Sequence, residues 1–235
     1  MSNIHSEPHG SASAGRLNWL RAAVLGANDG IISVASIVVG VAGAITDGRT
    51  VLISGVAGLL ACAFSMSAGE YVSVSSQRDT EQALLEKERK ELRDMPGEEL
   101  EELTRIYEGK GLSRATAEAV ARELTLHDAF TAHAEAELKI DPNDLTSPTA
   151  AAVASFASAM VGGIVPLIPI FLASESTRIL SVFISVFVAL VITGALSAWA
   201  SGAKMLPVTM RVVAGGLIAM LITFGIGKLF GVAGI

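Results

Sequence analysis

The sequence predicts an all-α polytopic membrane protein with five transmembrane helices and a helical domain inserted between the second and third of them. Two observations lead to this prediction. The composition is 51% hydrophobic and 17% charged, whereas about a quarter of the residues of a soluble protein are charged. The charges are also unevenly placed, because residues 147–235 contain five and residues 78–141 contain 27. One part of the chain therefore suits an apolar solvent and the other suits water.

Five apolar runs are long enough to cross a bilayer, which takes about 20 residues. They are residues 20–45, 51–74, 149–172, 177–200 and 207–230. Only the connection between the second and third runs is long. Pro166 and Pro169 should bend or unwind the third run, because proline has no backbone N–H to donate within a helix.

The remaining segments complete the predicted domain organisation. Residues 1–15 are small and polar, lack the pattern of a signal peptide, and are expected to form a disordered tail. Residues 16–77 should hold transmembrane helices 1 and 2, residues 78–146 the helical insertion, and residues 147–235 transmembrane helices 3–5.

Basic residues set the expected orientation in the membrane. With the N-terminus in the cytoplasm, 14 basic residues lie inside and 3 outside, or 4 against 3 without the long connection. We therefore expect the N-terminus and residues 78–146 to be cytoplasmic and the C-terminus to be outside.

The insertion has a helical pattern throughout. Residues 76–95 contain neither glycine nor proline, so the second run should continue as one helix into this segment. Pro96 suits the start of the next helix, Gly109 or Gly111 its end, and Ser113 the N-cap of another.

Polar groups inside the first two spans are candidates for function. Asp29 lies within the first span, where a carboxylate at a helix centre costs roughly 2.5–3.5 kcal/mol. Met66 and Glu70 share one face of the second span near its cytoplasmic end. A carboxylate beside a thioether suits a transition metal better than Ca²⁺ or Mg²⁺, although Met66 could simply pack and Glu70 could be interfacial. Cys62 is the only cysteine, and its neighbours predict a buried apolar thiol.

A second group of candidate ligands lies in the insertion. It consists of two glutamate pairs, each three residues apart, and a His-Glu pair four residues apart: Glu88, Glu91, Glu99, Glu102, His133 and Glu137. Crowded carboxylates repel unless a cation or protons neutralise them. The alternative to a metal site is a solvated acidic helix face with basic residues interspersed along it. His127 and Asp128 are adjacent and face different ways, so they are weaker candidates.

Several strings in the chain also occur together in a known family. GANDGIISVASIVVGVAGA, AFSMSAGEYVSVSSQRDTE, GLSRATAEAVARELT, HAEAELKIDP and GGIVPLIP follow in this order within residues 16–231. The sequence resembles the vacuolar iron transporter family, including its bacterial members. The resemblance implies a homodimer of five-span chains that exports divalent iron, and often manganese, from the cytoplasm in exchange for protons, along a path at the dimer interface.

The resemblance also implies roles for single residues. The family's path aspartate matches Asp29, its path methionine matches Met66, and Glu70 falls in its Gly-Glu motif.

The metal-binding residues of the family's cytoplasmic domain also have matches. They comprise two glutamate pairs and a later glutamate, which match Glu88, Glu91, Glu99, Glu102 and Glu137. Where eukaryotic members have two methionines the chain has His133 and Ala134, and His133 could serve as a nitrogen ligand.

These inferences predict a proton-coupled antiporter, a secondary active transporter and not an enzyme. The expected cargo is Fe²⁺ and Mn²⁺, with Co²⁺ and Zn²⁺ also tolerated by mixed ligand sets, and no permanently bound cofactor. The expected partners are these ions, protons, membrane lipid and a second copy of the chain, with no nucleic acid. Small residues on the first span would allow close helix approach in that dimer: Gly26, Gly30, Ala35 and Gly40. The expected location is the bacterial inner membrane.

Two other classes of function remain. A membrane-anchored ferritin-like iron-binding or iron-oxidising protein would need Glu-x-x-His pairs, and no glutamate in this chain has a histidine three residues later. A metal sensor with spans that only anchor it would have no use for Asp29, Glu70 and the two prolines within the membrane.

Overall fold

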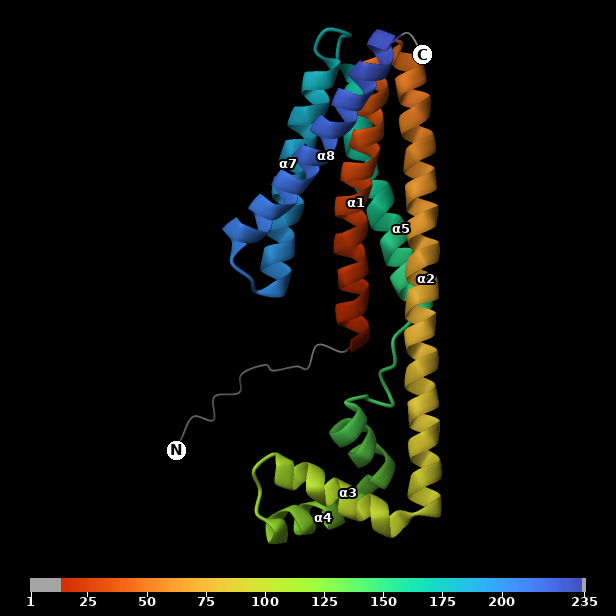
Figure 1. Ribbon diagram of the computed structural model, residues 1–235, viewed down its shortest axis with the longest axis vertical. Coiled ribbons are helices and arrows are strands. Elements are labelled where there is room, and N and C mark those ends of the chain that lie inside the picture. The colour runs from red at the N-terminus through yellow and green to blue at the C-terminus, as the bar shows by residue number, and fades with distance from the viewer. Residues whose placement is uncertain (1–13, 234–235) are drawn as a thin grey trace. The chain divides into compact units, whose positions relative to one another are not determined.

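The computed structural model describes residues 14–233, so most of the predicted tail, residues 1–15, lies outside the described residues. Within that range every regular element is helical, which confirms the all-α class (Figure 1). The elements are α1 (Ala14–Ala44), α2 (Gly48–Asp94), α3 (Pro96–Gly109), α4 (Arg114–His133), the π-helix η1 (Ala134–Leu138), α5 (Pro148–Ile164), the 3₁₀ helix η2 (Val165–Leu167), α6 (Ile168–Leu172), α7 (Arg178–Ser201) and α8 (Met205–Ala233).

Five helical segments of the described chain are long and apolar enough to cross a bilayer, as predicted. They are Arg21–Ala44, Gly48–Asp94, Pro148–Leu172, Arg178–Ser201 and Met205–Gly231. Large apolar side chains lie exposed on them, among them Leu172 at 81% and Trp199 at 77%. Such surfaces are unfavourable in water and suit a lipid environment.

The chain divides into two compact units. Of the described residues, one unit contains 14–17 and 73–147, and the other contains 18–72 and 148–233. The first unit overlaps the insertion predicted at residues 78–146, whose position in the cytoplasm stays a prediction. Helix α2 contributes residues to both units.

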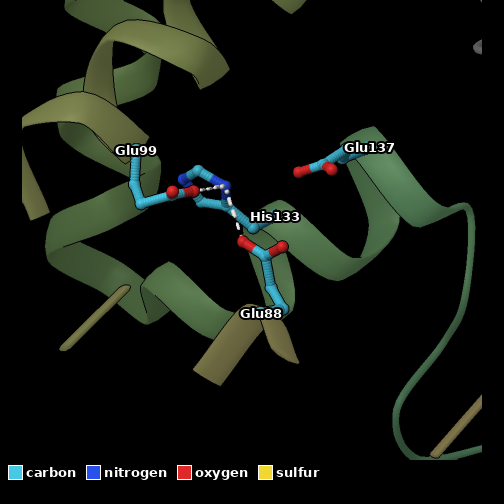
Figure 2. A group of neighbouring side chains, drawn as sticks. All are labelled: Glu88, Glu99, His133 and Glu137. Carbon is cyan, nitrogen blue, oxygen red and sulfur yellow. Dashed lines mark ion pairs between the residues drawn. The ribbon is translucent and has the colours of Figure 1, made fainter. Parts of the chain in front are cut away.

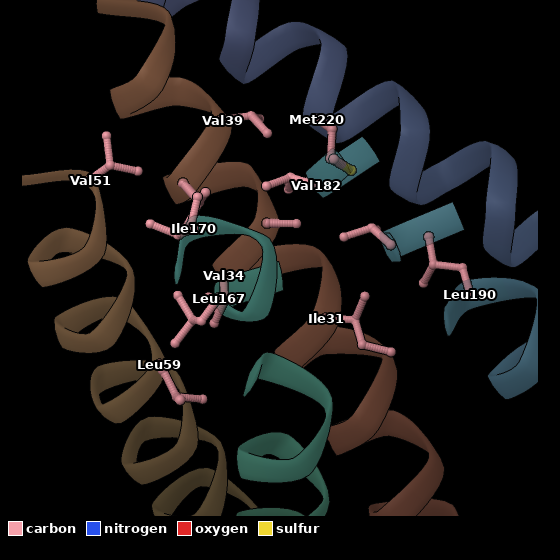
Figure 3. Packing of buried hydrophobic residues seen from close by; sticks show 13 residues of the cluster. Ile31, Val34, Val39, Val51, Leu59, Leu167, Ile170, Val182, Leu190 and Met220 are labelled. Carbon is pink, nitrogen blue, oxygen red and sulfur yellow. The ribbon is translucent and has the colours of Figure 1, made fainter. Parts of the chain in front are cut away.

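The core of the second unit draws on all five apolar segments (Figure 3). Its members are Ile31, Val34, Ala35, Val38 and Val39 of α1, Val51 and Leu59 of α2, Leu167 of η2, Ile170 of α6, Val182, Val186 and Leu190 of α7, and Met220 of α8. Helix α1 supplies the most, at a spacing of three and four residues that makes one continuous stripe. Helix α1 is therefore the element around which this unit packs.

Glycines let α1 approach its neighbours at backbone distance. A Cβ added to Gly30 would lie 2.4 Å from the Ala159 carbonyl oxygen of α5, and one added to Gly227 of α8 would lie 1.9 Å from the Gly40 carbonyl oxygen. The prediction of close helix approach is right, but the neighbours of Gly26, Gly30 and Gly40 are α5 and α8 of the same chain. These glycines therefore give no support to the predicted dimer.

The third apolar segment is interrupted where the sequence predicts a break. Helix α5 ends at Ile164, and the 3₁₀ helix η2, which contains Pro166, separates it from α6. Pro169 then occupies the first turn of α6, where a missing N–H costs nothing.

The contact between α1 and α8 gives a test of this packing. Gly227→Ala should lower the free energy of unfolding by about 1–3 kcal/mol, because the new methyl group forces two backbones apart. Gly225→Ala is the matched control two residues away, since a Cβ there meets no atom within 4 Å. Thermal unfolding in detergent measures both variants. Equal transition temperatures for the two would contradict the close approach.

Candidate functional site

Four candidate ligands of the unit containing residues 73–147 converge on one point (Figure 2). One ligand atom from each of Glu88, Glu99, His133 and Glu137 lies within 4.8 Å of the others. They come from α2, α3, α4 and η1 respectively. The structure therefore brings together four of the six residues that the sequence singles out here.

Local backbone features bring these helices together. Pro96 occupies the first turn of α3 directly after α2 ends, and Ser113 caps α4 by accepting a hydrogen bond from the Thr116 N–H, as predicted. His133 ends α4, and the wider turn of η1 follows it. Lys139 then closes η1 in the left-handed conformation, at a φ of 56°. The π-helical turn changes the angular spacing of the residues after His133, which a simple four-residue repeat does not predict.

Three of the four ligands are almost completely removed from solvent, and Glu137 is partly buried. His133 is 0% exposed, Glu88 2% and Glu99 5%. The Nδ1 atom of His133 lies 3.0 Å from Glu88 Oε1 and 3.6 Å from Glu99 Oε2. Neither ring nitrogen has a well-oriented hydrogen-bond partner, and nor does Glu88 Oε1. A buried polar atom without a partner costs about 1–3 kcal/mol, and a bound cation could supply the missing partner for these atoms.

Burial and mutual repulsion change the protonation of the group. Burial, followed by the charges of neighbouring carboxylates, raises the pKa of Glu88 to about 7. Burial, followed by the charge of Glu102, also raises the pKa values of Glu99 and Glu137. Burial lowers the pKa of His133 and favours its neutral imidazole, which is the form that binds metals. A divalent ion would relieve the repulsion that raises these carboxyl pKa values.

Two predicted ligands lie outside the compact group. Glu91 accepts a hydrogen bond from Lys87 Nζ at 2.9 Å, and Glu102 is exposed. Both carboxylates still raise the pKa of Glu88 through their charge. Asp128, the weaker candidate, instead accepts hydrogen bonds from the N–H and hydroxyl of Thr131 at a break inside α4.

Asp29 forms a second group of donors with α2, in the other unit. Its Oδ2 lies 3.7 Å from Cys62 Sγ, and that sulfur lies 3.8 Å from Met66 Sδ. The Ser33 hydroxyl donates to Asp29 Oδ1 at 3.3 Å. The prediction of a buried apolar thiol was wrong, because Cys62 is only partly buried and contacts a carboxylate. The available signal was its position four residues before Met66, on the same helix face.

Glu70 does not join Asp29 and Met66 in this arrangement. Its carboxylate forms an ion pair with Arg21 of α1 at 2.5 Å. Arg21 is one of the basic residues that predict the orientation of the chain, but its pairing with Glu70 was not predicted. Arg21 precedes Asp29 by eight residues, and Glu70 follows Cys62 by eight. Once Asp29 is placed against Cys62, these equal offsets on two antiparallel helices bring Arg21 beside Glu70.

The two donor groups suit different chemistry. The first offers carboxylate oxygens and one imidazole nitrogen, which accommodate Fe²⁺, Mn²⁺ and Zn²⁺. The second offers one carboxylate and two sulfur atoms on membrane-spanning helices, a set that discriminates against Mg²⁺ and Ca²⁺, which prefer oxygen ligands alone.

Comparisons with known proteins identify the family of the chain. A family model described as the VIT family matches residues 20–228. The chain is 44% identical to a vacuolar iron transporter of Acanthamoeba castellanii, over 96% of this chain and 84% of the relative. It is 39% identical to vacuolar iron transporter homolog 5 of Oryza sativa subsp. japonica, over 94% of this chain and 85% of the relative. It is 35% identical to vacuolar iron transporter homolog 2 of Arabidopsis thaliana, over 94% of this chain and 88% of the relative. The chain is thus an integral membrane protein that belongs to the VIT family.

Proposed function

We propose that this protein transports divalent iron, and also manganese, out of the cytoplasm in exchange for protons. The observation that carries the proposal is the contact of Asp29 with Cys62 beside Met66, inside helices apolar enough to span a membrane. A carboxylate at such a position is expensive to keep and is functional by default. The relatives named vacuolar iron transporter support iron as the cargo.

Asp29 is the proposed exchange group of the transport path. A carboxylate can hold either a metal ion or a proton, so release of the ion on the far side would leave Asp29 to take up a proton. Met66 supplies a soft thioether ligand to the same ion. The interruption at η2 offers a place where the third span could flex during alternating access.

The glutamate–histidine group is the proposed capture site. Glu88, Glu99, His133 and Glu137 would bind the ion, while the charges of Glu91 and Glu102 would attract it. This group would raise the ion concentration at the cytoplasmic mouth of the path. Co²⁺ and Zn²⁺ fit the same donor types.

We place the protein in a bacterial inner membrane as a homodimer. The N-terminus and residues 78–146 would be cytoplasmic and the C-terminus outside. The excess of basic residues on the proposed inner side supports this orientation. The dimer rests on the family resemblance and not on the glycines of α1, which pack within the chain.

Asp29→Asn should reduce transport at least about tenfold, because the amide cannot exchange a proton for a metal ion. The measurement follows Mn²⁺ entry into proteoliposomes with and without a pH gradient. A pH-sensitive dye inside them reports the accompanying proton movement. Glu175→Gln, an exposed acid outside the helices, is the control. Transport by Asp29→Asn at the wild-type rate would show that the path is elsewhere.

Glu137→Gln should weaken Mn²⁺ binding about 10–100-fold in calorimetry, because it removes one donor from the group. Glu135→Gln is the matched control, since this carboxylate is exposed and lies two residues away on the same turn. If both variants bind like the wild type, the capture site is assigned to the wrong residues.

Mn²⁺ binding to the capture site should depend on pH. Below about pH 7 Glu88 carries a proton in the metal-free protein, so the ion must displace that proton. The affinity should therefore fall as pH decreases below 7, by up to about tenfold per pH unit, and level off above it. The lowered pKa of His133 keeps the imidazole from adding a competing proton near pH 7. Calorimetry between pH 6 and 8 tests this, and a constant affinity would contradict it.

A further inference from the structure

Arg21 and Glu70 form an ion pair that links α1 and α2 within the membrane-spanning unit. The guanidinium Nη2 lies 2.5 Å from Glu70 Oε1. The Glu70 side chain is only 10% exposed, whereas that of Arg21 is 54% exposed. The carboxylate is therefore nearly buried, while the arginine that neutralises it remains in contact with solvent.

The ion pair has a fixed position relative to the Asp29 site. Asp29 contacts Cys62, Arg21 contacts Glu70, and the residues of each helix are eight apart. At 1.5 Å per residue this is about 12 Å along the helices. Going along α2 from Cys62 to Val72, the order is Cys62, Met66 and then Glu70. In the proposed orientation this is the cytoplasmic end, so a cation approaching Asp29 meets the pair first.

We propose that Arg21 is a built-in competing cation, which holds the Glu70 carboxylate until a divalent ion displaces it. In this role Arg21 sets the affinity and the charge selectivity of ion entry toward Asp29. The inference rests on the proposed transport function and adds a specificity-determining residue to it.

The difference in exposure explains why the arginine is the partner that leaves. A nearly buried carboxylate is costly to leave unpaired, so Arg21 departs only when another cation takes its place. The guanidinium is exposed and ends a long side chain, so it can swing outward while its alkyl part stays on the protein.

Charge decides which ions can take that place. Electrostatic attraction to a carboxylate is proportional to the charge of the ion. A divalent ion can therefore outcompete the guanidinium, which is itself monovalent and makes directional hydrogen bonds. Na⁺ and K⁺ carry the same single charge without those hydrogen bonds. The pair should thus admit divalent ions and exclude monovalent ones.

The test measures the half-saturating Mn²⁺ concentration of the full chain in proteoliposomes. Arg21→Gln should lower it roughly tenfold, because the competitor is removed, and should make transport sensitive to excess Na⁺. Glu70→Gln should raise it, because the carboxylate is lost. Arg21→Lys keeps the charge, so its half-saturating Mn²⁺ concentration should be closer to the wild-type value than that of Arg21→Gln. Arg49→Gln, an exposed arginine at the other end of the same spans, is the control and should change nothing.

The double variant separates this mechanism from a simple structural tie or a general field effect. With Glu70→Gln already present, Arg21→Gln should have no further effect on the half-saturating concentration. A tie between helices predicts that both single variants shift it in the same direction. A general field effect predicts that Arg21→Gln acts equally in both backgrounds. Either result would overturn the proposal.

Cys62 supplies a readout that does not require transport. It is the only cysteine in the chain, so a water-soluble thiol reagent reports this one position. Arg21→Gln should increase the labelling rate of Cys62, and Arg21→Lys should not. Unchanged labelling in Arg21→Gln would contradict entry past the pair. If the wild type transports no divalent ion, the proposed transport function itself is wrong. The labelling rate of Cys62 is then still a separate test of whether Arg21 limits access to this position.

Discussion

A carboxylate that leaves water needs a cation, a proton or a set of hydrogen-bond donors, and this requirement shapes both units. Glu70 is nearly buried and has Arg21. Glu88 is buried among other carboxylates, and burial and their charges raise its pKa to about 7, which favours its protonated form. Asp29 accepts hydrogen bonds from the hydroxyl of Ser33 and the thiol of Cys62. The three carboxylates thus satisfy one requirement in three ways.

These differences give each carboxylate a distinct place in the proposed transport. The group around Glu88 would exchange protons for a metal ion near neutral pH and could therefore collect and release ions. Glu70 would exchange Arg21 for an incoming ion and in this way select for charge. Asp29 contacts the thiol of Cys62, which lies beside Met66, so in the proposed transport it would select among divalent ions by ligand type.

Helix α1 links this chemistry to the packing of the membrane unit. Gly30, next to Asp29, meets the backbone of α5 at a distance that a side chain could not tolerate. Ile31 and Val34 continue into the buried core. The face that bears Asp29 is therefore fixed against α2, because the other faces of α1 are held by α5, α7 and α8. The small residues and the apolar stripe of α1 therefore fix the position of the Asp29 carboxylate.

The sequence by itself determined the five apolar segments, the helix caps at Pro96 and Ser113, the break at Pro166 and the candidate ligands, because each depends on residues close together in the chain. It could not decide which partners those residues meet. Glu91 and Glu102 have the same spacing signal as Glu88 and Glu99, yet only the latter two reach His133, because helix packing and the turn at η1 choose among them. The pairing of Glu70 with Arg21 and the contact of Cys62 with Asp29 likewise follow from the register of two antiparallel helices. That register is a property of tertiary packing, and no local pattern specifies it.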